Sequence, residues 1–410
     1  MKQYDVVIAG GGLVGAALAC GLASQGRTVA VIEAAARDGT HQPSYDDRTL
    51  VINAASLNIL TNLGLLPDSL TRTNVEHIEI SRAGGFGHLR LRAAEHGCRR
   101  FGAVIVAREL GNVMLAALKS HQNISEFCPA SLAEYSVIGD QVEVRLADGE
   151  SLQTSLLVGA DGNRSQVRQA AGLDCDSHDY GQSAMIFNVM PGQAPPNTAW
   201  ERFTPRGPLA LLPQAGGRLG VVWIDRSEEI ELAMGWTDEA LIERLNHRFG
   251  PSLGYFSHPG RRACYPLLRQ RTVWPVAERV VLVGNAANAV HPVSAQGFNL
   301  GLRDVAGLVD ALEGAHDPGH PSLLESYANA RQGDQEATVR YTDTLARAFT
   351  NPTAMASLMA SIGLAAHAGW PALSRRLVRA AMGFREPVSS LAREPGPKPG
   401  SDGANRINYS

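Results

Sequence analysis

The feature that most constrains this chain is a glycine-rich turn that directly follows its first predicted strand. Residues 4–9 are expected to form a strand that ends in four apolar residues, Gly10, Gly12 and Gly15 follow it, and Glu33 comes at the end of the next apolar run. In this spacing Gly10 allows a tight turn, Gly12 lets the backbone approach a pyrophosphate, and Gly15 permits close packing of a helix on a strand. Glu33 is placed to bind a ribose hydroxyl. The segment predicts a dinucleotide-binding fold; the alternative is a glycine-rich turn that binds nothing.

A second cluster, residues 279–304, indicates which dinucleotide. A buried strand is expected to end in a turn at Gly284 and Asn285, and a helix is expected to begin near Gly297. The free N–H groups and the dipole of that helix would face an anion. Such a terminus suits the negative charge of a reduced isoalloxazine, so the cluster predicts the flavin end of FAD. Phe298 and Asn299 become candidate flavin contacts through their backbone N–H groups, or else ordinary helix-capping residues.

This second cluster resembles the signature of the ubiquinone-biosynthesis hydroxylases, which belong to the class A flavoprotein aromatic hydroxylases. Three further matches follow the family's order: Arg48, Arg108, and Asp161 with Gly162. The resemblance implies that Arg48 reaches the cofactor, that Arg108 lies near its ribitol and pyrophosphate, and that the Asp-Gly pair serves both FAD and the nicotinamide cofactor. The alternative for both arginines is a solvated surface position. Residues 200–213 look most like the family member that acts on 2-polyprenyl-6-methoxyphenol.

The chain departs from the family pattern at two places. Asn285 stands where the family has Asp, and Asn can still accept a ribitol hydrogen bond through its carbonyl oxygen. Ser294 and Ala295 stand where the motif prefers a small residue followed by Gly. Because Ala tolerates a positive φ poorly, the loop before Gln296 is expected to differ slightly in backbone shape.

Composition limits the class of protein. With 410 residues, of which 44% are hydrophobic, the chain can bury a large core and form two connected domains. A net charge of −3 gives no indication of nucleic-acid binding. Five dispersed cysteines without CxxC spacing suggest reduced thiols in a cytoplasm, and the N-terminal residues do not have the pattern of a signal peptide.

The pattern of elements predicts an α/β, two-domain fold. A Rossmann-like FAD-binding domain with a parallel sheet would carry an inserted, mostly antiparallel β-sheet domain that binds substrate, with the pocket at their interface. The expected FAD-binding segments are 1–75, 100–175 and 270–335; the substrate segments are 76–99 and 176–269; a C-terminal helical region covers 336–386 and a disordered tail covers 387–410.

No second glycine-rich nucleotide turn, HExxH zinc motif or G-x-S-x-G nucleophile elbow is found in the sequence. The cofactor must therefore carry the difficult step. The resemblance implies that NAD(P)H reduces FAD, that O₂ adds at flavin C4a, and that the hydroperoxide hydroxylates a polyprenylated phenol on the way to ubiquinone. Two alternatives remain: another flavin monooxygenase or oxidase on this scaffold, and a catalytically silent scaffold subunit that binds FAD or quinone.

Side-chain candidates for the reaction lie on one loop. Relatives offer a backbone carbonyl at Pro292, and His291 and Gln296 flank it, so all three are expected near the phenol or the flavin. His291 could act as a base or could order the loop through hydrogen bonds. Three aromatic residues, Trp200, Phe203 and Trp223, could line an apolar pocket or belong to the core.

The C-terminal third contains a stretch, residues 348–374, without any charged residue. It is too polar and too short to predict a transmembrane helix. Residues 373–381 carry Leu373, Leu377 and Ala381 on one helical face and arginines on the other. This basic amphipathic segment could lie on the inner membrane, contact another quinone-biosynthesis protein, or pack on the chain's own FAD domain.

Overall fold

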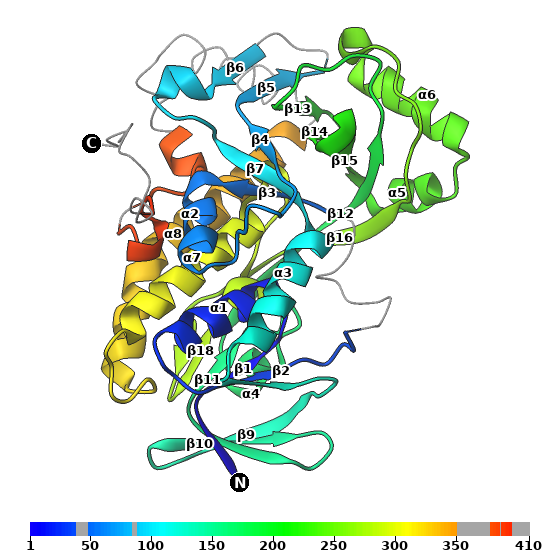
Figure 1. The fold of residues 1–410 in the computed structure, drawn as a ribbon. Coiled ribbons are helices and arrows are strands. Elements are labelled where there is room, and N and C mark those ends of the chain that lie inside the picture. The colour runs from blue at the N-terminus through cyan, green and yellow to red at the C-terminus, as the bar shows by residue number, and fades with distance from the viewer. Residues whose placement is uncertain (38–47, 84–87, 351–377, 386, 396–410) are drawn as a thin grey trace.

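The computed structural model describes residues 1–37, 48–83, 88–350, 378–385 and 387–395, and of residues 348–350 it describes only the backbone (Figure 1). Asp46, Asp47 and most of the uncharged C-terminal stretch, with Leu373 and Leu377, lie outside the described residues.

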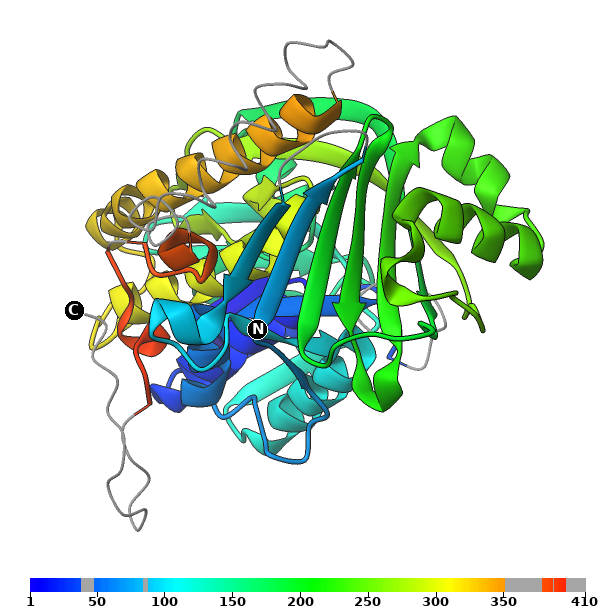
Figure 2. The ribbon, with the colours of Figure 1, turned by 90° about the horizontal axis from the view of Figure 1, so that it is seen from above.

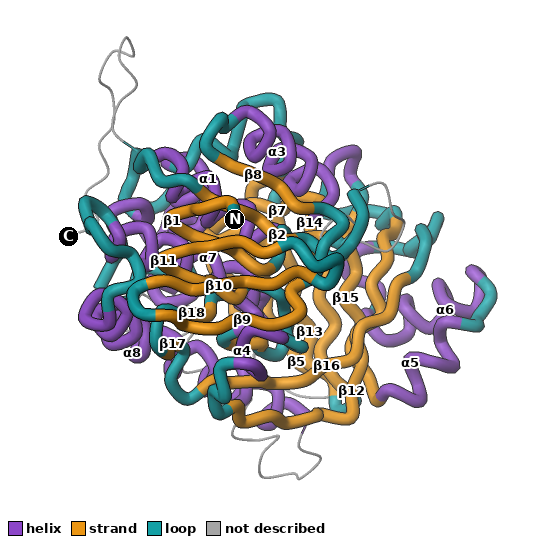
Figure 3. Tube along the Cα trace, turned by 90° about the horizontal axis from the view of Figure 1, so that it is seen from below, coloured by secondary structure: helices purple, strands orange, loops and turns teal. Residues whose placement is uncertain are grey.

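The first sheet is built on parallel strands in the order β18-β11-β1-β2-β8. An antiparallel strand, β17, lies at one edge, and the β9–β10 hairpin extends the sheet from β11. Figure 3 shows these strands side by side. Their bounds are β1 Lys2–Ala9, β2 Val29–Ile32, β8 Ile124–Phe127, β9 Leu132–Ile138, β10 Gln141–Leu146, β11 Ser151–Gly159, β17 Val276–Ala277 and β18 Val280–Leu282.

Both faces of this sheet are covered, which explains its continuous Val/Ile/Leu runs. Val6 and Ile8 of β1 point to a core shared with five helices, whereas Val7 and Ala9 point to a second core beneath the β9–β10 hairpin. The helices of the first core are α1 Leu13–Ser24, α2 Ala54–Asn62, α3 Ala107–Ser120 and α7 Gln296–Leu312, with α8 Pro321–Thr350 packed along α7; α4 Gln166–Ala170 lies on the hairpin side.

A three-stranded antiparallel sheet, β3-β7-β4, lies between the two large sheets. Its strands are β3 Thr49–Asn53, β4 Thr73–Val75 and β7 Gly102–Val106.

The second large sheet has the order β19-β16-β12-β15-β14-β13-β5-β6 and is antiparallel except where β13 pairs with β5. One face packs on α5 Ser227–Met234 and α6 Asp238–Phe249, and the other is turned toward the first part of the molecule (Figure 2). Its strands are β5 His77–Arg82, β6 His88–Arg92, β12 Cys175–Val189, β13 Thr198–Thr204, β14 Gly207–Pro213, β15 Leu219–Arg226, β16 Ala263–Thr272 and β19 Asn288–Ala289. The α/β fold class predicted from the sequence is confirmed.

Short 3₁₀ helices complete the described elements. They are Ala93–His96, Ala215–Gly217, Pro251–Leu253, Gly284–Ala286, Val293–Ala295 and Ser390–Ala392.

Two predictions about the C-terminal third differ from the structure. The expected boundary at residue 336 falls inside α8, which is continuous from Pro321 to Thr350. Residues 387–395 were expected to be disordered but pack on α2, where Asn58 and Asn62 donate side-chain hydrogen bonds to their carbonyl groups. A polar tail is ordered here because neighbouring helices supply partners for its backbone. No helix in the part of the chain that the structure describes combines the length and apolarity needed to cross a bilayer.

Candidate active site

The first glycine turn is packed so closely that two of its positions exclude any side chain. Gly10 has φ +107°, and a Cβ there would lie 2.3 Å from the carbonyl oxygen of Ala160 at the end of β11. A Cβ on Gly15 would lie 1.9 Å from the carbonyl oxygen of Gly10. Gly12, in extended conformation, is the N-cap of α1. The turn therefore brings the start of α1 directly against the carboxyl ends of β1 and β11.

Glu33 lies against this turn at the end of β2. Its Oε2 accepts a hydrogen bond from the Gly11 N–H (2.8 Å) and its Oε1 accepts one from the Ala35 N–H (2.8 Å). Arg37, which the sequence did not single out, donates from Nη1 to the Gly11 carbonyl (3.1 Å) and from Nε to Glu126 (2.6 Å). A carboxylate and a guanidinium thus flank the position where the sequence predicts a ribose.

The two glycine turns, far apart in the chain, meet at the side chain of Val14 on α1. A Cβ on Gly284 would lie 3.0 Å from one Val14 methyl, and a Cβ on Gly301 would lie 2.9 Å from the other. The loop after β11 joins them, since the buried Arg168 donates to the Ala286 carbonyl (2.9 Å) and to the Asn163 carbonyl (2.8 Å). The structure therefore brings together the Gly10 turn, the Asp161 loop and the Gly284 turn.

Asp161 offers an unused acceptor in this region. Its Oδ2 holds the start of α4, accepting from the N–H groups of Gln166 (2.7 Å) and Val167 (3.2 Å). Its Oδ1 is buried and has no hydrogen-bond partner among the described residues. Gly162 follows with φ +79°, a conformation that glycine adopts without strain. A buried acceptor without a donor indicates that a ligand group completes the site.

The helix α7 begins at Gln296, one residue before the predicted start. Its first turn has no capping side chain and no acidic residue, so its N–H groups are available to a ligand. Asn299 is 2% exposed, and its side chain bonds the carbonyls of Ala295 (2.7 Å) and Val51 (2.8 Å) and the Asn53 N–H (2.9 Å). That side chain is therefore structural. Phe298 packs against the core of α1 and α7, and Gly297 is partly exposed in the first turn.

The residues that depart from the family pattern lie in the loop before α7 and at the Gly284 turn. Ser294 and Ala295 both have positive φ, +66° and +51°, so the loop adopts a left-handed path without a glycine. A hydrogen bond from Ala295 N–H to the Pro292 carbonyl (2.8 Å) helps to fix this strained path. Asn285 is exposed at the Gly284 turn, and its ribitol contact stays a prediction.

His291 is fully buried on the same loop. Its Nδ1 accepts the Val293 N–H (3.2 Å), so the proton of the neutral ring is on Nε2, which has no partner among the described residues. Burial lowers the pKa of His291 to about 4, against a smaller opposing effect of Asp343. The ring also packs edge-to-face on Tyr180, 4.9 Å between centroids. A neutral ring whose lone pair is engaged favours the loop-ordering role over the base. Gln296 is buried and donates to the Ser294 carbonyl (3.3 Å).

The two predicted arginines lie where the start of β3 is hydrogen-bonded to the start of α3. The Arg48 carbonyl accepts the Ala107 N–H (2.8 Å), and the Arg48 guanidinium lies over the Tyr265 ring, 5.0 Å from its centroid. Arg108 is exposed in the first turn of α3. Phosphate or flavin contact by either residue stays a prediction.

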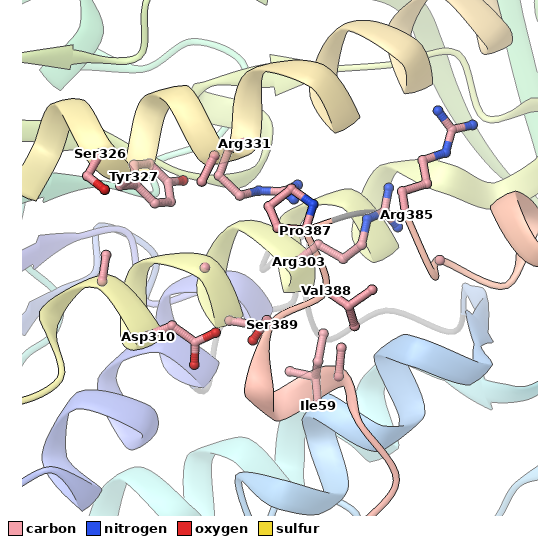
Figure 4. Close-up of a pocket in the computed structure, with 16 residues that line it drawn as sticks. Ile59, Arg303, Asp310, Ser326, Tyr327, Arg331, Arg385, Pro387, Val388 and Ser389 are labelled. Atoms are coloured by element: carbon pink, nitrogen blue, oxygen red, sulfur yellow. The ribbon is translucent and has the colours of Figure 1, made fainter. Parts of the chain in front are cut away.

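Two cavities lie away from the glycine turns. One of about 270 Å³ lies between α7, α8 and the C-terminal segment and is lined by none of the predicted site residues (Figure 4). A smaller one of about 30 Å³ is lined by Gln296, Tyr341 and Arg385 among others. Of the three aromatic residues, Trp200 and Trp223 belong to the core shared with α5 and α6, whereas Phe203 packs with Val293 of the loop.

These observations fit FAD. Glycines that tolerate no side chain, an uncapped α1 and an uncapped α7 converge with the unpartnered oxygen of Asp161, and together they form a cradle of N–H donors and acceptors for a dinucleotide. Comparison with known proteins agrees: the model of the FAD binding domain family matches residues 3–342. Ubiquinone hydroxylase UbiL of Rhodospirillum rubrum is 36% identical over 387 residues, which cover 93% of this chain and 90% of that protein.

The chain belongs to the FAD-dependent ubiquinone-biosynthesis hydroxylases. A second relative of this hydroxylase, 3-demethoxyubiquinol 3-hydroxylase of Escherichia coli, is 32% identical and covers 93% of this chain and 99% of its own. Among solved structures, p-nitrophenol 4-monooxygenase PnpA of Pseudomonas putida has the same fold, with a TM-score of 0.77 at 20% identity, over 94% of this chain and 100% of that one. This hydroxylase is thus an FAD-dependent monooxygenase.

Proposed function

We propose that this hydroxylase uses NAD(P)H and O₂ to hydroxylate the ring of a polyprenylated phenol, 2-polyprenyl-6-methoxyphenol, to the 1,4-benzoquinol. The observation that carries the proposal is the convergence at Val14 of the two glycine turns, with the α7 N-terminus next to them. Similarity over 93% of the chain to two hydroxylases named for ubiquinone supports the substrate class. Likeness of residues 200–213 to the family member acting on this phenol supports the ring position.

The roles of the chain's own residues follow from the geometry. Residues of the Gly10 turn, Glu33 and the start of α1 would hold the adenosine and pyrophosphate end of FAD, and the start of α7 with the Gly284 turn would hold the flavin end. When bound, FAD supplies the redox chemistry and the activation of oxygen. The protein's remaining tasks are to orient an already electron-rich phenol and to exclude water. The side of the second sheet that faces the 291–296 loop is the proposed substrate surface.

Purified enzyme with bound FAD tests the proposal. We expect the phenol to accelerate NAD(P)H oxidation at least about tenfold and to yield a product that carries one atom of ¹⁸O from ¹⁸O₂, identified by mass spectrometry. Oxidation of NAD(P)H that needs no phenol would identify an oxidase, and absence of both reactions would identify a scaffold. A second candidate reaction is the one named for the Escherichia coli relative, hydroxylation of 3-demethoxyubiquinol at ring carbon 3. Supplying 3-demethoxyubiquinol as substrate in place of the phenol tests this candidate.

We place the protein in the cytoplasm, with peripheral contact to the inner membrane or to other quinone-biosynthesis proteins through the C-terminal region, because the proposed substrate carries a long apolar tail. The division into an FAD-binding part and a substrate-binding sheet is likewise our proposal.

A further inference from the structure

Glu201 lies in the middle of β13, on the face of the second sheet that is turned toward the first part of the molecule. Side chains alternate along a strand, so Glu201 shares its face with Ala199 and Phe203. Ala199 belongs to a cluster with Val75 and Val104 of the three-stranded sheet, and Phe203 packs with Val293 of the active-site loop. The Glu201 carboxylate is therefore directed to the same interior region as that loop.

In the part of the chain that the structure describes, no cationic side chain forms an ion pair with Glu201. Its cross-strand neighbours are Ile80 on β5 and Ala210 on β14. Tyr341 on α8 lies close enough to interact with Glu201, since burial and the charge of Glu201 both raise the pKa of Tyr341 while a hydrogen bond with Ser294 lowers it. The charge of Arg385 also lowers the pKa of Tyr341, and Arg385 pairs with Asp334 (3.8 Å). None of the described residues forms a hydrogen bond or an ion pair with the Glu201 carboxylate.

The side chain is nevertheless deep in the protein. Desolvation raises the pKa of Glu201 to about 7, although part of its surface remains exposed. Protein atoms therefore surround the carboxylate, while part of the residue stays accessible to solvent. An interior carboxylate without a partner is unfavourable for folding, so its presence at an active-site surface indicates a functional role.

We propose that Glu201 accepts the hydrogen bond of the substrate's phenol hydroxyl and takes its proton as the ring is hydroxylated. This inference rests on the proposed function. The phenolic O–H bond breaks, a new O–H bond forms on the carboxylate, and the oxygen's electron pair moves into the ring toward the carbon that is attacked. The attacked carbon gains one oxygen atom of the O₂ that bound FAD would activate with electrons from NAD(P)H, and the O–O bond breaks so that the second oxygen atom leaves as water. The hydrogen on that carbon then leaves as a proton to solvent, its electron pair restores the aromatic ring, and Glu201 returns its proton to the phenolic oxygen.

Its protonation behaviour suits this role. A general base works best when its pKa is near the operating pH, and a carboxylate of ordinary acidity would be a far weaker base for a phenol. His291, the other candidate on the loop, has its Nδ1 lone pair engaged and carries its proton on Nε2. Glu201 therefore offers an unoccupied acceptor where His291 offers a donor.

The test is Glu201→Gln in the FAD-loaded enzyme, which keeps the shape of the side chain and removes its charge. We expect hydroxylation with 2-prenyl-6-methoxyphenol as probe to fall at least about 100-fold at pH 8, and the rise of rate through about pH 7 to disappear. FAD content should be unchanged. Glu201→Asp should restore part of the rate and the pH dependence. A rate within about threefold of wild type, with the rise through pH 7 retained, would overturn the proposal.

A second measurement does not depend on turnover. The pKa of Glu201 is raised in the folded protein, so its ionisation destabilises the fold progressively as pH rises from about 4.5 toward 8. Glu201→Gln should therefore raise the thermal midpoint at pH 8 more than at pH 5. An equal effect at both pH values would show that Glu201 is not an unpaired interior carboxylate. Wild-type enzyme that does not hydroxylate the probe, although this stability difference is present, would contradict the proposed function. Glu201 would in that case still be an unpaired interior carboxylate.

Glu79→Gln is the matched control. Glu79 lies on β5 opposite Trp200, on the other face of the sheet, and pairs with His88 (3.4 Å) and Arg90 (3.4 Å) near the surface. Its substitution should leave rate, pH dependence and thermal midpoint unchanged. Effects as large as those of Glu201→Gln would show that any lost carboxylate in this sheet disturbs the enzyme, and would overturn the assignment to Glu201.

Discussion

Protein carrying Gly15→Ala should purify without FAD. The added methyl would lie 1.9 Å from the Gly10 carbonyl oxygen and 3.4 Å from the Ala160 Cβ, and the first of these neighbours is backbone at the centre of the turn. The start of α1 must then move away from β1 by on the order of 1 Å, and its N–H groups move with it. Visible flavin absorbance of the purified protein, before and after incubation with excess FAD, measures the loss, which we expect to exceed about 100-fold in affinity.

Gly333→Ala is the control for this substitution. Gly333 is exposed in the middle of α8, has no neighbour within 4 Å of an added Cβ, and does not have a positive φ. Because alanine is the better helix former, this change should stabilise the protein by up to about 1 kcal/mol and leave FAD content intact. Circular dichroism separates loss of binding from loss of folding. Gly15→Ala protein that binds FAD as tightly as wild type would contradict the role of the turn.

The elements that sequence reasoning predicted are those specified by local pattern. The Gly10 turn, the start of α7 and the parallel strands could be predicted because glycine spacing and runs of β-branched residues act over a few neighbours. Which face of a strand meets which partner is not local information. The alternation of β13 placed Trp200 and Glu201 on opposite faces, but only tertiary packing shows that Trp200 meets α5 and α6 while Phe203, on the face of Glu201, clusters with Val293 of the active-site loop.

Roles that depend on three-dimensional neighbours were correspondingly missed. Arg303 and Asp304 are the last residues of the 279–304 cluster, and sequence reasoning assigned them no role. Their partners on α8 are about 30 residues further along the chain. Arg168 and Arg37 similarly act through carbonyls that are distant in sequence. The order of residues 387–395 depends on donors from α2. The signal that could have identified Glu201 was present, since an acidic residue with Ala and Phe at the i±2 positions is unusual for an inward face.

Replacing Arg331 by Met should destabilise the fold more than any surface substitution. Arg331 on α8 donates from Nε to Asp304 (3.0 Å) and from Nη2 to Asp334 (2.8 Å), and all three side chains are buried (Figure 4 shows Arg303 and Arg331). Burial tends to raise the pKa of Asp334, but Arg303 and Arg331 together lower it to about 2. Removing Arg331 leaves buried carboxylates undercompensated, which typically costs about 3–5 kcal/mol.

In a chain of this length that loss corresponds to a fall of roughly 4–6 °C in thermal midpoint. Arg145→Met is the matched control, because the pair of Arg145 with Glu134 is exposed and such pairs contribute at most about 1 kcal/mol. Equal effects of the two substitutions would contradict the prediction.

A double variant identifies the cause of the instability. Asp304 Oδ2 accepts the Gly284 N–H (3.2 Å), so this carboxylate links α8 to the turn at the flavin end of the site. In Arg331→Met/Asp304→Asn the uncompensated charge is gone, while the Asn carbonyl oxygen can still accept from Gly284. We therefore expect the double variant to recover part of the thermal midpoint lost by Arg331→Met alone. If the two losses simply add, the damage comes from lost packing and not from an unpaired carboxylate.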